Sequence, residues 1–448
     1  MSEQRAWTMM VYMAGDNGKI LAGEQIFDPM EQAGLDDLRE MEQAGATKQV
    51  AVVAQFDSLA QTAESYRVVI QPRGGVRQME RIVEMNTGDP SALIDFVVWS
   101  MAAFPAAHYA LVLWNHGTGW KDDDLYAFAK RHKLRLAASI DEVRGATKRR
   151  RRSARGGHPR LSSGLFLSSA AAIAALKDSQ SRGICYDDSS MDFLDNSELE
   201  GALRDVTSRT GRKIDLLGMD ACLMSMLEVG YQLREQANYL VASQEAAPMV
   251  GWPYGPILQE LGRNPEIEPG LLARRIVEEY GRSFGDEPRG WDSPIAQSAL
   301  DLSRMDDLAG AMTRLSRALR GSLSGGDLFL VDALRRARNS VVRFEDDDYA
   351  DLHDFLSLLR QRYAGEDAVL KEAIDEVITM LAPNRARSVI MANVVTGPSP
   401  FERATGLSIY LPQSGYSPYY DRLACATLGW GEFLCELNEV PAERRRIL

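Results

Sequence analysis

The chain has 448 residues, of which 45% are hydrophobic and 25% are charged, and its formal net charge is −12. These fractions are those of an ordinary soluble globular protein, and the length predicts two domains or one enlarged domain with appendages. No stretch approaches the ~20 apolar residues that span a bilayer, which excludes a membrane partner.

The first 260 residues alternate apolar runs with amphipathic stretches, a pattern typical of a mostly parallel sheet with helices on both faces. Residues 67–71, followed by Pro72-Arg73-Gly74-Gly75, indicate half of a surface hairpin. The other strands are expected at residues 9–14, 50–56, 109–114, 214–217 and 239–242, and helices at residues 21–44 and 91–103.

After about residue 260 the pattern becomes largely helical. An apolar stripe there comprises Leu352, Phe355, Leu356 and Leu359. Two late strands are expected at residues 388–395 and 407–411. The sequence therefore predicts an α/β fold in two parts, residues 1–260 and a mostly helical C-terminal part, residues 261–448.

Cys222 follows the apolar run at residues 214–217 and precedes apolar residues that recur at helical spacing. This pattern predicts a strand that delivers Cys222 to the N-terminus of a helix, where partial positive charge favours the nucleophilic thiolate. The alternative is a small buried thiol in the core.

His116 and Gly117 follow the predicted strand at residues 109–114. Ligands and catalytic groups gather beyond the carboxyl ends of parallel strands, so His116 and Cys222 are expected to share one site. His116 would take the proton of the thiol and pass it to a leaving amine. The alternative for His116 is a turn residue that only hydrogen-bonds a neighbour.

The segments His116-Gly117-Thr118-Gly119-Trp120 and Asp220-Ala221-Cys222-Leu223-Met224 resemble the histidine and cysteine motifs of the clostripain family of cysteine peptidases, in the caspase-like clan. The opening strand and the segment Gly406-Leu407-Ser408-Ile409-Tyr410-Leu411-Pro412 are also similar to the family. The resemblance implies a caspase-like catalytic domain at residues 1–260 and a His116/Cys222 dyad. It also implies an oxyanion hole formed by the backbone N–H groups of Gly117 and Cys222.

A long connection, residues 121–186, joins the two motifs and contains an arginine-rich stretch, Lys148-Arg149-Arg150-Arg151-Arg152-Ser153-Ala154-Arg155. Adjacent cations repel one another, which predicts an exposed loop. Family members are commonly activated by cleavage here, so the resemblance implies a processing loop at Arg149, Arg150, Arg151, Arg152 and Arg155. The alternatives are an inert solvated loop or nonspecific nucleic-acid binding, which the absence of interleaved aromatics disfavours.

The resemblance also places Asp220 at a position that binds a basic substrate side chain. One buried guanidinium needs at least one ionised carboxylate, and Glu245 is a further candidate. The alternative for Asp220 is a helix N-cap. Trp120 and Trp252 would line the substrate cleft, or pack in the core.

The expected chemistry requires no cofactor, but certain relatives need calcium, and hard cations prefer oxygen ligands. The candidate acidic clusters are Asp122-Asp123-Asp124, Asp187-Asp188 and Glu345-Asp346-Asp347-Asp348. None has the spacing of an EF-hand loop, and consecutive acids on loops are usually solvated.

The four cysteines lack the spacing of a disulfide framework, and the first residues lack the features of a secretory signal. A cytoplasmic location is therefore expected. The sequence predicts a cysteine endopeptidase acting on peptides or proteins after Arg or Lys, held inactive until processing or until an activating partner or ligand binds. The alternative is a catalytically silent caspase-like regulatory or nucleic-acid-associated module.

Overall fold

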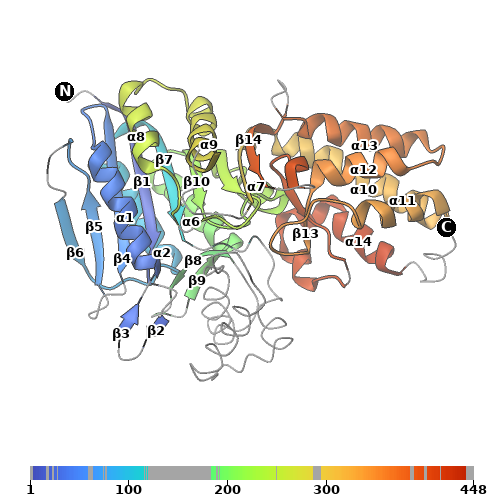
Figure 1. Cartoon of the computed structure of the whole chain (residues 1–448), viewed down its shortest axis with the longest axis horizontal. Coiled ribbons are helices and arrows are strands. Elements are labelled where there is room, and N and C mark those ends of the chain that lie inside the picture. The colour runs from blue at the N-terminus through green and yellow to red at the C-terminus, as the bar shows by residue number, and fades with distance from the viewer. Residues whose placement is uncertain are drawn as a thin grey trace. The chain divides into compact units, whose positions relative to one another are not determined.

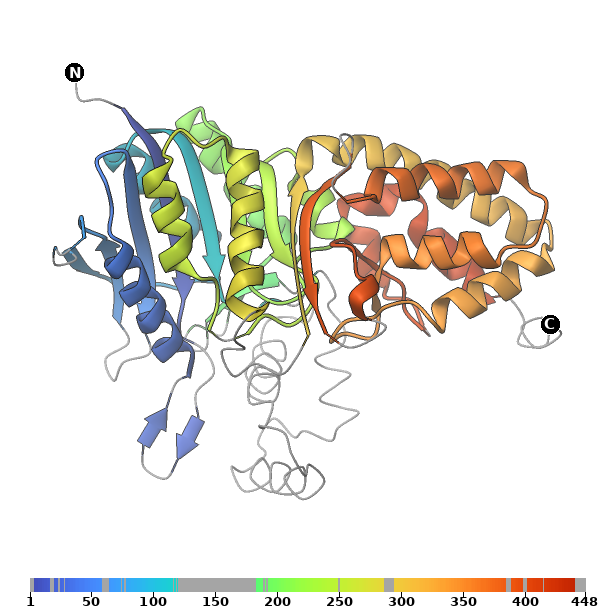
Figure 2. The ribbon, with the colours of Figure 1, turned by 45° about the horizontal axis from the view of Figure 1, so that its top comes forward.

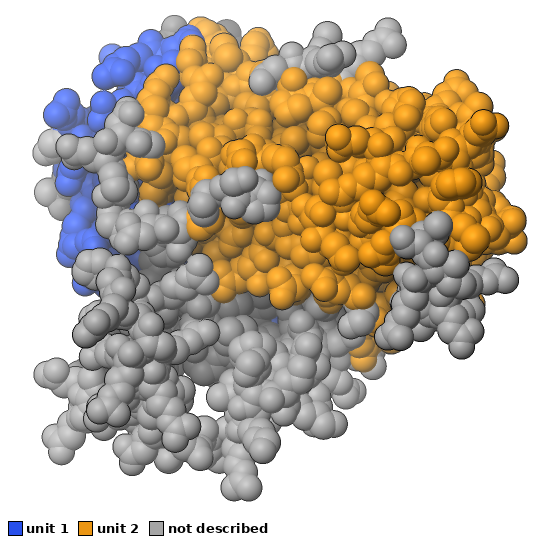
Figure 3. All heavy atoms as spheres, turned by 45° about the vertical axis from the view of Figure 1, so that its right-hand side comes forward, with its two compact units in different colours: residues 1–210, 248–265, 288–292 blue, residues 211–247, 266–287, 293–448 orange. Residues whose placement is uncertain are grey.

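The structure is a computed structural model. It describes residues 4–16, 20–22, 25–27, 29–58, 64–73, 75, 78–115, 117, 119, 183–187, 190, 192–248, 250–285, 294–383, 388–397, 401–413 and 415–439. The chain forms two compact units, coloured separately in Figure 3. Unit 1 comprises residues 1–210, 248–265 and 288–292, and unit 2 comprises residues 211–247, 266–287 and 293–448. The division at residue 260 stays a prediction.

Unit 1 is built on five strands in the order β7-β1-β4-β5-β6. β1 is parallel to both β4 and β7, and β5 is antiparallel to β4 and β6. Every residue of β4 is buried, as expected for a parallel strand covered on both faces. The bounds are β1 (Arg5–Ala14), β4 (Val50–Ser58), β5 (Glu64–Val69), β6 (Gln78–Ile82) and β7 (Ala106–Trp114).

Helices cover both faces of these strands. α1 (Pro29–Ala44) and α8 (Tyr254–Arg263) lie on one face, and α2 (Pro90–Ala103) and α6 (Asn196–Thr210) lie on the other (Figures 1 and 2). α2 begins where Asp89 accepts a hydrogen bond from Ser91 N–H, an N-cap that satisfies one of the free donors of the helix. Two short pairs complete the unit: β2 (Ile20–Ala22) with β3 (Gln25–Phe27), and β8 (Gly183–Asp187) with β9 (Asp192–Asp195).

The predicted helix at residues 21–44 is wrong in its first part. Residues 20–22 and 25–27 pair as the antiparallel strands β2 and β3, and the helix starts at Pro29. Proline is favoured at the first helical position because its missing N–H would have no partner there. The predicted hairpin near residues 67–71 is confirmed as β5 and β6.

Unit 2 contributes four strands in the order β14-β12-β11-β10. β10 and β11 are parallel, whereas β12 is antiparallel to β11 and β14. α9 packs across these strands (Figure 2). The bounds are β10 (Ile214–Asp220), β11 (Ala237–Ser243), β12 (Ile295–Asp301), β14 (Ile390–Thr396), α7 (Leu227–Leu233) and α9 (Pro269–Gly285).

The rest of unit 2 is largely helical. The predicted apolar stripe Leu352, Phe355, Leu356 and Leu359 is buried on α12, and the two late strands are confirmed as β14 and β15. The bounds are α10 (Met305–Ser324), α11 (Leu328–Arg338), α12 (Leu352–Arg362), α13 (Ala368–Leu381), α14 (Trp430–Glu439), β13 (Tyr349–Asp351) and β15 (Ser408–Tyr410), with one-turn 3₁₀ segments η1 (Leu302–Arg304), η2 (Phe401–Arg403), η3 (Pro418–Arg422) and η4 (Ala424–Leu428). The expected α/β class, with parallel central strands between helices, is confirmed. Among the described helices, none is long and apolar enough to cross a membrane.

Glu228 is a buried carboxyl group on α7. Its Oε1 accepts hydrogen bonds from Tyr410 N–H at 2.9 Å and from the Tyr420 hydroxyl at 3.3 Å. Burial raises the pKa of Glu228 from its usual 4.5 to about 7, and these hydrogen bonds offset only part of the rise. Folded Glu228 therefore binds its proton more tightly than the unfolded chain does. The stabilisation that this proton gives is present below pH 4.5 and is lost as the pH rises through about 7.

We expect Glu228→Gln to make the urea midpoint of unfolding less dependent on pH between 4.5 and about 7. Glutamine keeps the shape of the protonated carboxyl group and cannot ionise, so it removes a slope of at most about 1.4 kcal/mol per pH unit. Glu372→Gln, at an exposed position of α13, is the control and should leave the slope unchanged. An unaltered slope in Glu228→Gln would contradict the expectation.

Candidate active site

Cys222 lies on a loop between β10, which ends at Asp220, and α7, which begins at Leu227. The expectation that Cys222 occupies a helix N-terminus is therefore wrong. The helix starts only after Ser225, because this residue forms hydrogen bonds with other segments. Ser225 N–H donates to Ser243 O at 2.9 Å, and Ser408 N–H donates to Ser225 O at 2.9 Å. Leu223 also has a φ of 60°, in the left-handed region that residues with a side chain rarely adopt. Strain of this kind is typically stored at functional sites.

The Cys222 thiol is partly exposed and has a backbone donor. Ala247 N–H donates to Sγ at 3.2 Å. The neighbouring Leu223 N–H reaches Glu245 O at 3.4 Å, so with the bond from Ser225 to Ser243 residues 243–247 contact the cysteine loop three times. A hydrogen bond to sulfur favours the charged thiolate over the neutral thiol. The Ala247 N–H group therefore favours the thiolate, the effect that was expected from a helix N-terminus.

Asp220 is the last residue of β10, two residues before Cys222, and is 5% exposed. The N-cap alternative is wrong, because the N-cap position of α7 is Met226. Tyr280 on α9 lies within electrostatic range of both Asp220 and Cys222. Burial raises the pKa of Tyr280 well above its usual value, and the charges of Asp220 and Cys222 raise it further. Asp220 is thus a buried carboxyl group close to the thiol.

Glu245 joins the cysteine loop mainly through its backbone. Its carbonyl oxygen faces Leu223 N–H, and its side chain accepts a hydrogen bond from Ala246 N–H at 2.9 Å. The residue is 8% exposed. The structure brings Glu245 and Cys222 together, but part of the carboxylate's hydrogen-bonding capacity is used within its own turn.

Several predicted site residues lie outside the described residues: His116, Trp120, Arg149, Arg150, Arg151, Arg152 and Arg155. Gly117 belongs to unit 1, where it is buried and forms an antiparallel bridge with Ile184. The strand expected before it is confirmed as β7, which ends at Trp114. Trp252 is 1% exposed and packs beside Tyr254, with ring centroids 6.5 Å apart. This burial favours the core alternative for Trp252.

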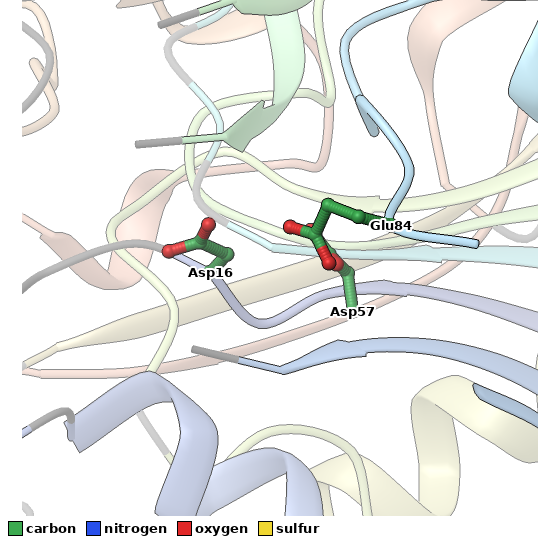
Figure 4. A group of neighbouring side chains, drawn as sticks. All are labelled: Asp16, Asp57 and Glu84. Carbon is green, nitrogen blue, oxygen red and sulfur yellow. The ribbon is translucent and has the colours of Figure 1, made fainter. Parts of the chain in front are cut away.

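A group of carboxylates in unit 1 lies close enough together to hold a metal ion. Ligand oxygens of Asp16, Asp57 and Glu84 lie within 4.8 Å of one another, and Figure 4 shows Asp57 and Glu84 together with Asp16 beside them. This is the only such group among the described residues. Sequence reasoning missed it because the three residues come from different parts of the chain: Asp57 lies near the end of β4, and Asp16 and Glu84 follow β1 and β6. The available signal was an acidic residue at or just beyond the end of each strand.

Asp57 is a buried member of this group, and its pKa is raised. Its Oδ1 accepts a hydrogen bond from the Ser65 hydroxyl at 2.9 Å, and no donor among the described residues reaches Oδ2. Burial raises the pKa of Asp57 to about 9, and the charge of Asp187 adds to the rise. Asp57 therefore retains a proton at neutral pH unless a cation takes the place of that proton.

Of the predicted acidic clusters, Asp187 lies near this group, since its charge raises the pKa of Asp57, whereas residues 345–348 belong to unit 2. Asp187 accepts hydrogen bonds from Thr87 N–H at 2.9 Å and Ser190 N–H at 2.7 Å. Residues 345–348 form a turn against Arg343. Burial lowers the pKa of Arg343, and the negative charges of Asp346, Asp347 and Asp348 partly offset this effect by favouring the charged guanidinium. Residues 122–124 and Asp188 lie outside the described residues.

Comparison with known proteins places the chain in a family. The sequence model of the Clostripain family matches residues 11–134 and 166–433. Clostripain of Hathewaya histolytica is 23% identical over 382 residues, which are 75% of this chain and 60% of that protein. The chain thus spans about 60% of the length of that relative.

Two solved structures share the fold. A secreted C11 cysteine protease from Bacteroides thetaiotaomicron, in complex with an irreversible peptide inhibitor, has a TM-score of 0.58 at 17% identity, covering 95% of this chain and 99% of that one. An inactive zymogen C11 protease from Parabacteroides distasonis has a TM-score of 0.58 at 17% identity, covering 96% and 99%. The resemblance seen in the histidine and cysteine motifs is confirmed: the chain belongs to the clostripain family of cysteine proteases.

Proposed function

We propose that this protein is a cysteine endopeptidase that cleaves after basic residues, with His116 and Cys222 as its dyad. The observation that carries the proposal is the setting of Cys222. Its thiol lies on a strained turn just after a buried strand, within hydrogen-bond distance of Ala247 N–H. Membership of the clostripain family supports the same chemistry.

In the proposed mechanism the Cys222 thiolate attacks the carbonyl carbon of the scissile bond and forms a C–S bond. The N–H groups of Gly117 and Cys222 hold the oxyanion. Protonated His116 gives its proton to the leaving amine as the C–N bond breaks, which leaves a thioester. Water then gives a proton to His116 and attacks the thioester, and the departing thiolate restores the starting state.

The preference for Arg, with Lys as a weaker substrate, is proposed from Asp220. A guanidinium in a closed pocket needs a carboxylate, and Asp220 is a buried acid two residues from the thiol. Glu245 is a second candidate for this contact. Trp120 is proposed to line the cleft, and Trp252 would support it from the core.

We propose control by cleavage of the arginine-rich stretch at Arg149–Arg152 and Arg155, or by a partner or ligand. An enzyme that cuts after arginine would find its own site there. One related structure is described as an inactive zymogen, which supports this form of control. The catalytic steps need no cofactor, because a thiol and an imidazole suffice. A bound calcium ion would find oxygen ligands in Asp16, Asp57 and Glu84.

A reducing, cytoplasmic setting is proposed because all four cysteines are free thiols. Cys185 and Cys425 are buried, and Cys222 and Cys435 are half-buried. Peptide or protein substrates are the expected partners, and nucleic acid is not.

The proposal is tested by following intact mass over time for the wild type and for Cys222→Ala, each with and without calcium. We expect only the wild type to cut itself, near residues 149–155, and a variant with these arginines replaced by glutamine to stay whole. Fragments that appear equally in Cys222→Ala would contradict self-processing. Salt-dependent nucleic-acid binding that disappears with the arginines, in a chain whose Cys222 never reacts, would favour the silent binding module instead.

A further inference from the structure

Gln244 and Asp351 form a buried hydrogen bond in unit 2 that the proposed mechanism does not use. Gln244 Nε2 donates to Asp351 Oδ2 at 3.1 Å, and both residues are 0% exposed. They lie 107 positions apart in the sequence. A polar pair buried this completely needs all its hydrogen bonds to be satisfied, so its geometry is closely fixed.

Asp351 is held on several sides. Its Oδ1 caps α12 by accepting a hydrogen bond from Asp354 N–H at 2.8 Å, and its Oδ2 accepts one from Thr405 N–H at 2.6 Å. On the other side, Gly406 N–H donates to Gln244 Oε1 at 2.8 Å. These contacts set which end of the amide faces the carboxylate, because only the NH₂ group can donate to Asp351.

Gln244 lies at the centre of the segment that contacts the cysteine loop. Ser243 O accepts a hydrogen bond from Ser225 N–H at 2.9 Å, and Glu245 O faces Leu223 N–H. Ala247 N–H reaches the Cys222 sulfur. Residues 243–247 thus carry three of the contacts that hold the loop, and the side chain of Gln244 anchors the segment to Asp351.

We propose that Gln244 and Asp351 are positioning residues for the Cys222 thiol, an inference that rests on the proposed role of Cys222 as nucleophile. The pair holds residues 243–247 in place, so that Ala247 N–H points at the Cys222 sulfur and Glu245 O accepts a hydrogen bond from Leu223 N–H. Without the pair the segment relaxes, and the thiolate loses its donor. Neither residue touches the reacting atoms.

The test measures the alkylation rate of Cys222 by iodoacetamide against pH, with the modified cysteine identified by peptide mass mapping. Gln244→Met removes the amide at similar length and leaves the α12 cap in place. Asp351→Asn replaces one carboxylate oxygen with an NH₂ group, so that Gln244 Nε2 and Thr405 N–H lose the acceptor Oδ2. The matched control is Asp367→Asn, which alters an N-cap of the same kind: Asp367 accepts hydrogen bonds from Leu370 N–H at 3.0 Å and the Ser322 hydroxyl at 2.8 Å.

We expect the pH midpoint of Cys222 alkylation to rise in Gln244→Met and in Asp351→Asn, with the rate at pH 7 falling about three- to tenfold. Asp367→Asn should match the wild type, and Cys435, another half-buried thiol, should react alike in all four proteins. An unchanged Cys222 profile in folded Gln244→Met, or an equal shift in Asp367→Asn, would overturn the inference. If Asp351→Asn fails to fold, Gln244→Met decides the question.

These outcomes are separate from a failure of the proposed function. A wild-type Cys222 that reacts no faster than Cys435 at any pH would contradict the nucleophile role itself, and the positioning role with it. A reactive wild-type Cys222 whose profile is unaffected by Gln244→Met would contradict the positioning role alone.

Discussion

Cys222→Ala is expected to lower kcat for hydrolysis of an arginine peptide by on the order of 10⁴-fold or more, as removal of a covalent nucleophile does in other hydrolases. The loss should fall on kcat, because the substrate pocket is left intact. The measurement is release of a reporter amine from a peptide with arginine before the scissile bond.

Cys435→Ala is the matched control for this substitution. Cys435 is also a half-buried free thiol, but it lies on α14. The Cys435→Ala variant should retain full activity. Residual hydrolysis in Cys222→Ala within tenfold of the wild type, in protein free of contaminating protease, would remove Cys222 from the mechanism.

Asp220→Asn is expected to lower kcat/KM for the arginine peptide by about 30-fold or more. Removing one partner of a buried charge pair costs about 2–5 kcal/mol, because the guanidinium is left without its carboxylate. Hydrolysis of a leucine peptide, which makes no such pair, should change little. The ratio of the two kcat/KM values is therefore the informative quantity.

Two further variants make this result specific. Asp215→Asn changes an acid near the start of the same strand, β10, and should leave the ratio unchanged. Glu245→Gln separates the two candidate acids: if it lowers the ratio and Asp220→Asn does not, Glu245 is the specificity residue. Equal losses on the arginine and leucine peptides in Asp220→Asn would mean that Asp220 supports the fold of the loop and not the recognition of arginine.

Much of the fold was predictable because apolar runs carry a local signal. Residues 214–217 read as a buried strand, and β10 covers them and continues to Asp220. The predicted helix at residues 91–103 agrees to within one residue with α2, which the structure shows to be capped by Asp89. Local signals failed at residues 20–22 and 25–27, which form two short strands before the helix that starts at Pro29.

The site was less predictable, because distant segments set its geometry. The motif containing Cys222 was visible in the sequence, but the start of α7 at Leu227 depends on pairing of Ser225 with residues 243 and 408. No local pattern records those partners. The same limit applies to the bond between Gln244 and Asp351 and to the group of Asp16, Asp57 and Glu84, which come from separate strands.

The most direct test of the central claim is covalent labelling by a peptide that ends in arginine and carries a thiol-reactive ketone. The account predicts one adduct per chain, mapped to Cys222, absent in Cys222→Ala and suppressed by excess arginine peptide. A matching probe ending in aspartate should not label. No adduct on Cys222, even after the arginine-rich segment has been cut by limited proteolysis, would contradict the assignment of this chain as an active cysteine peptidase.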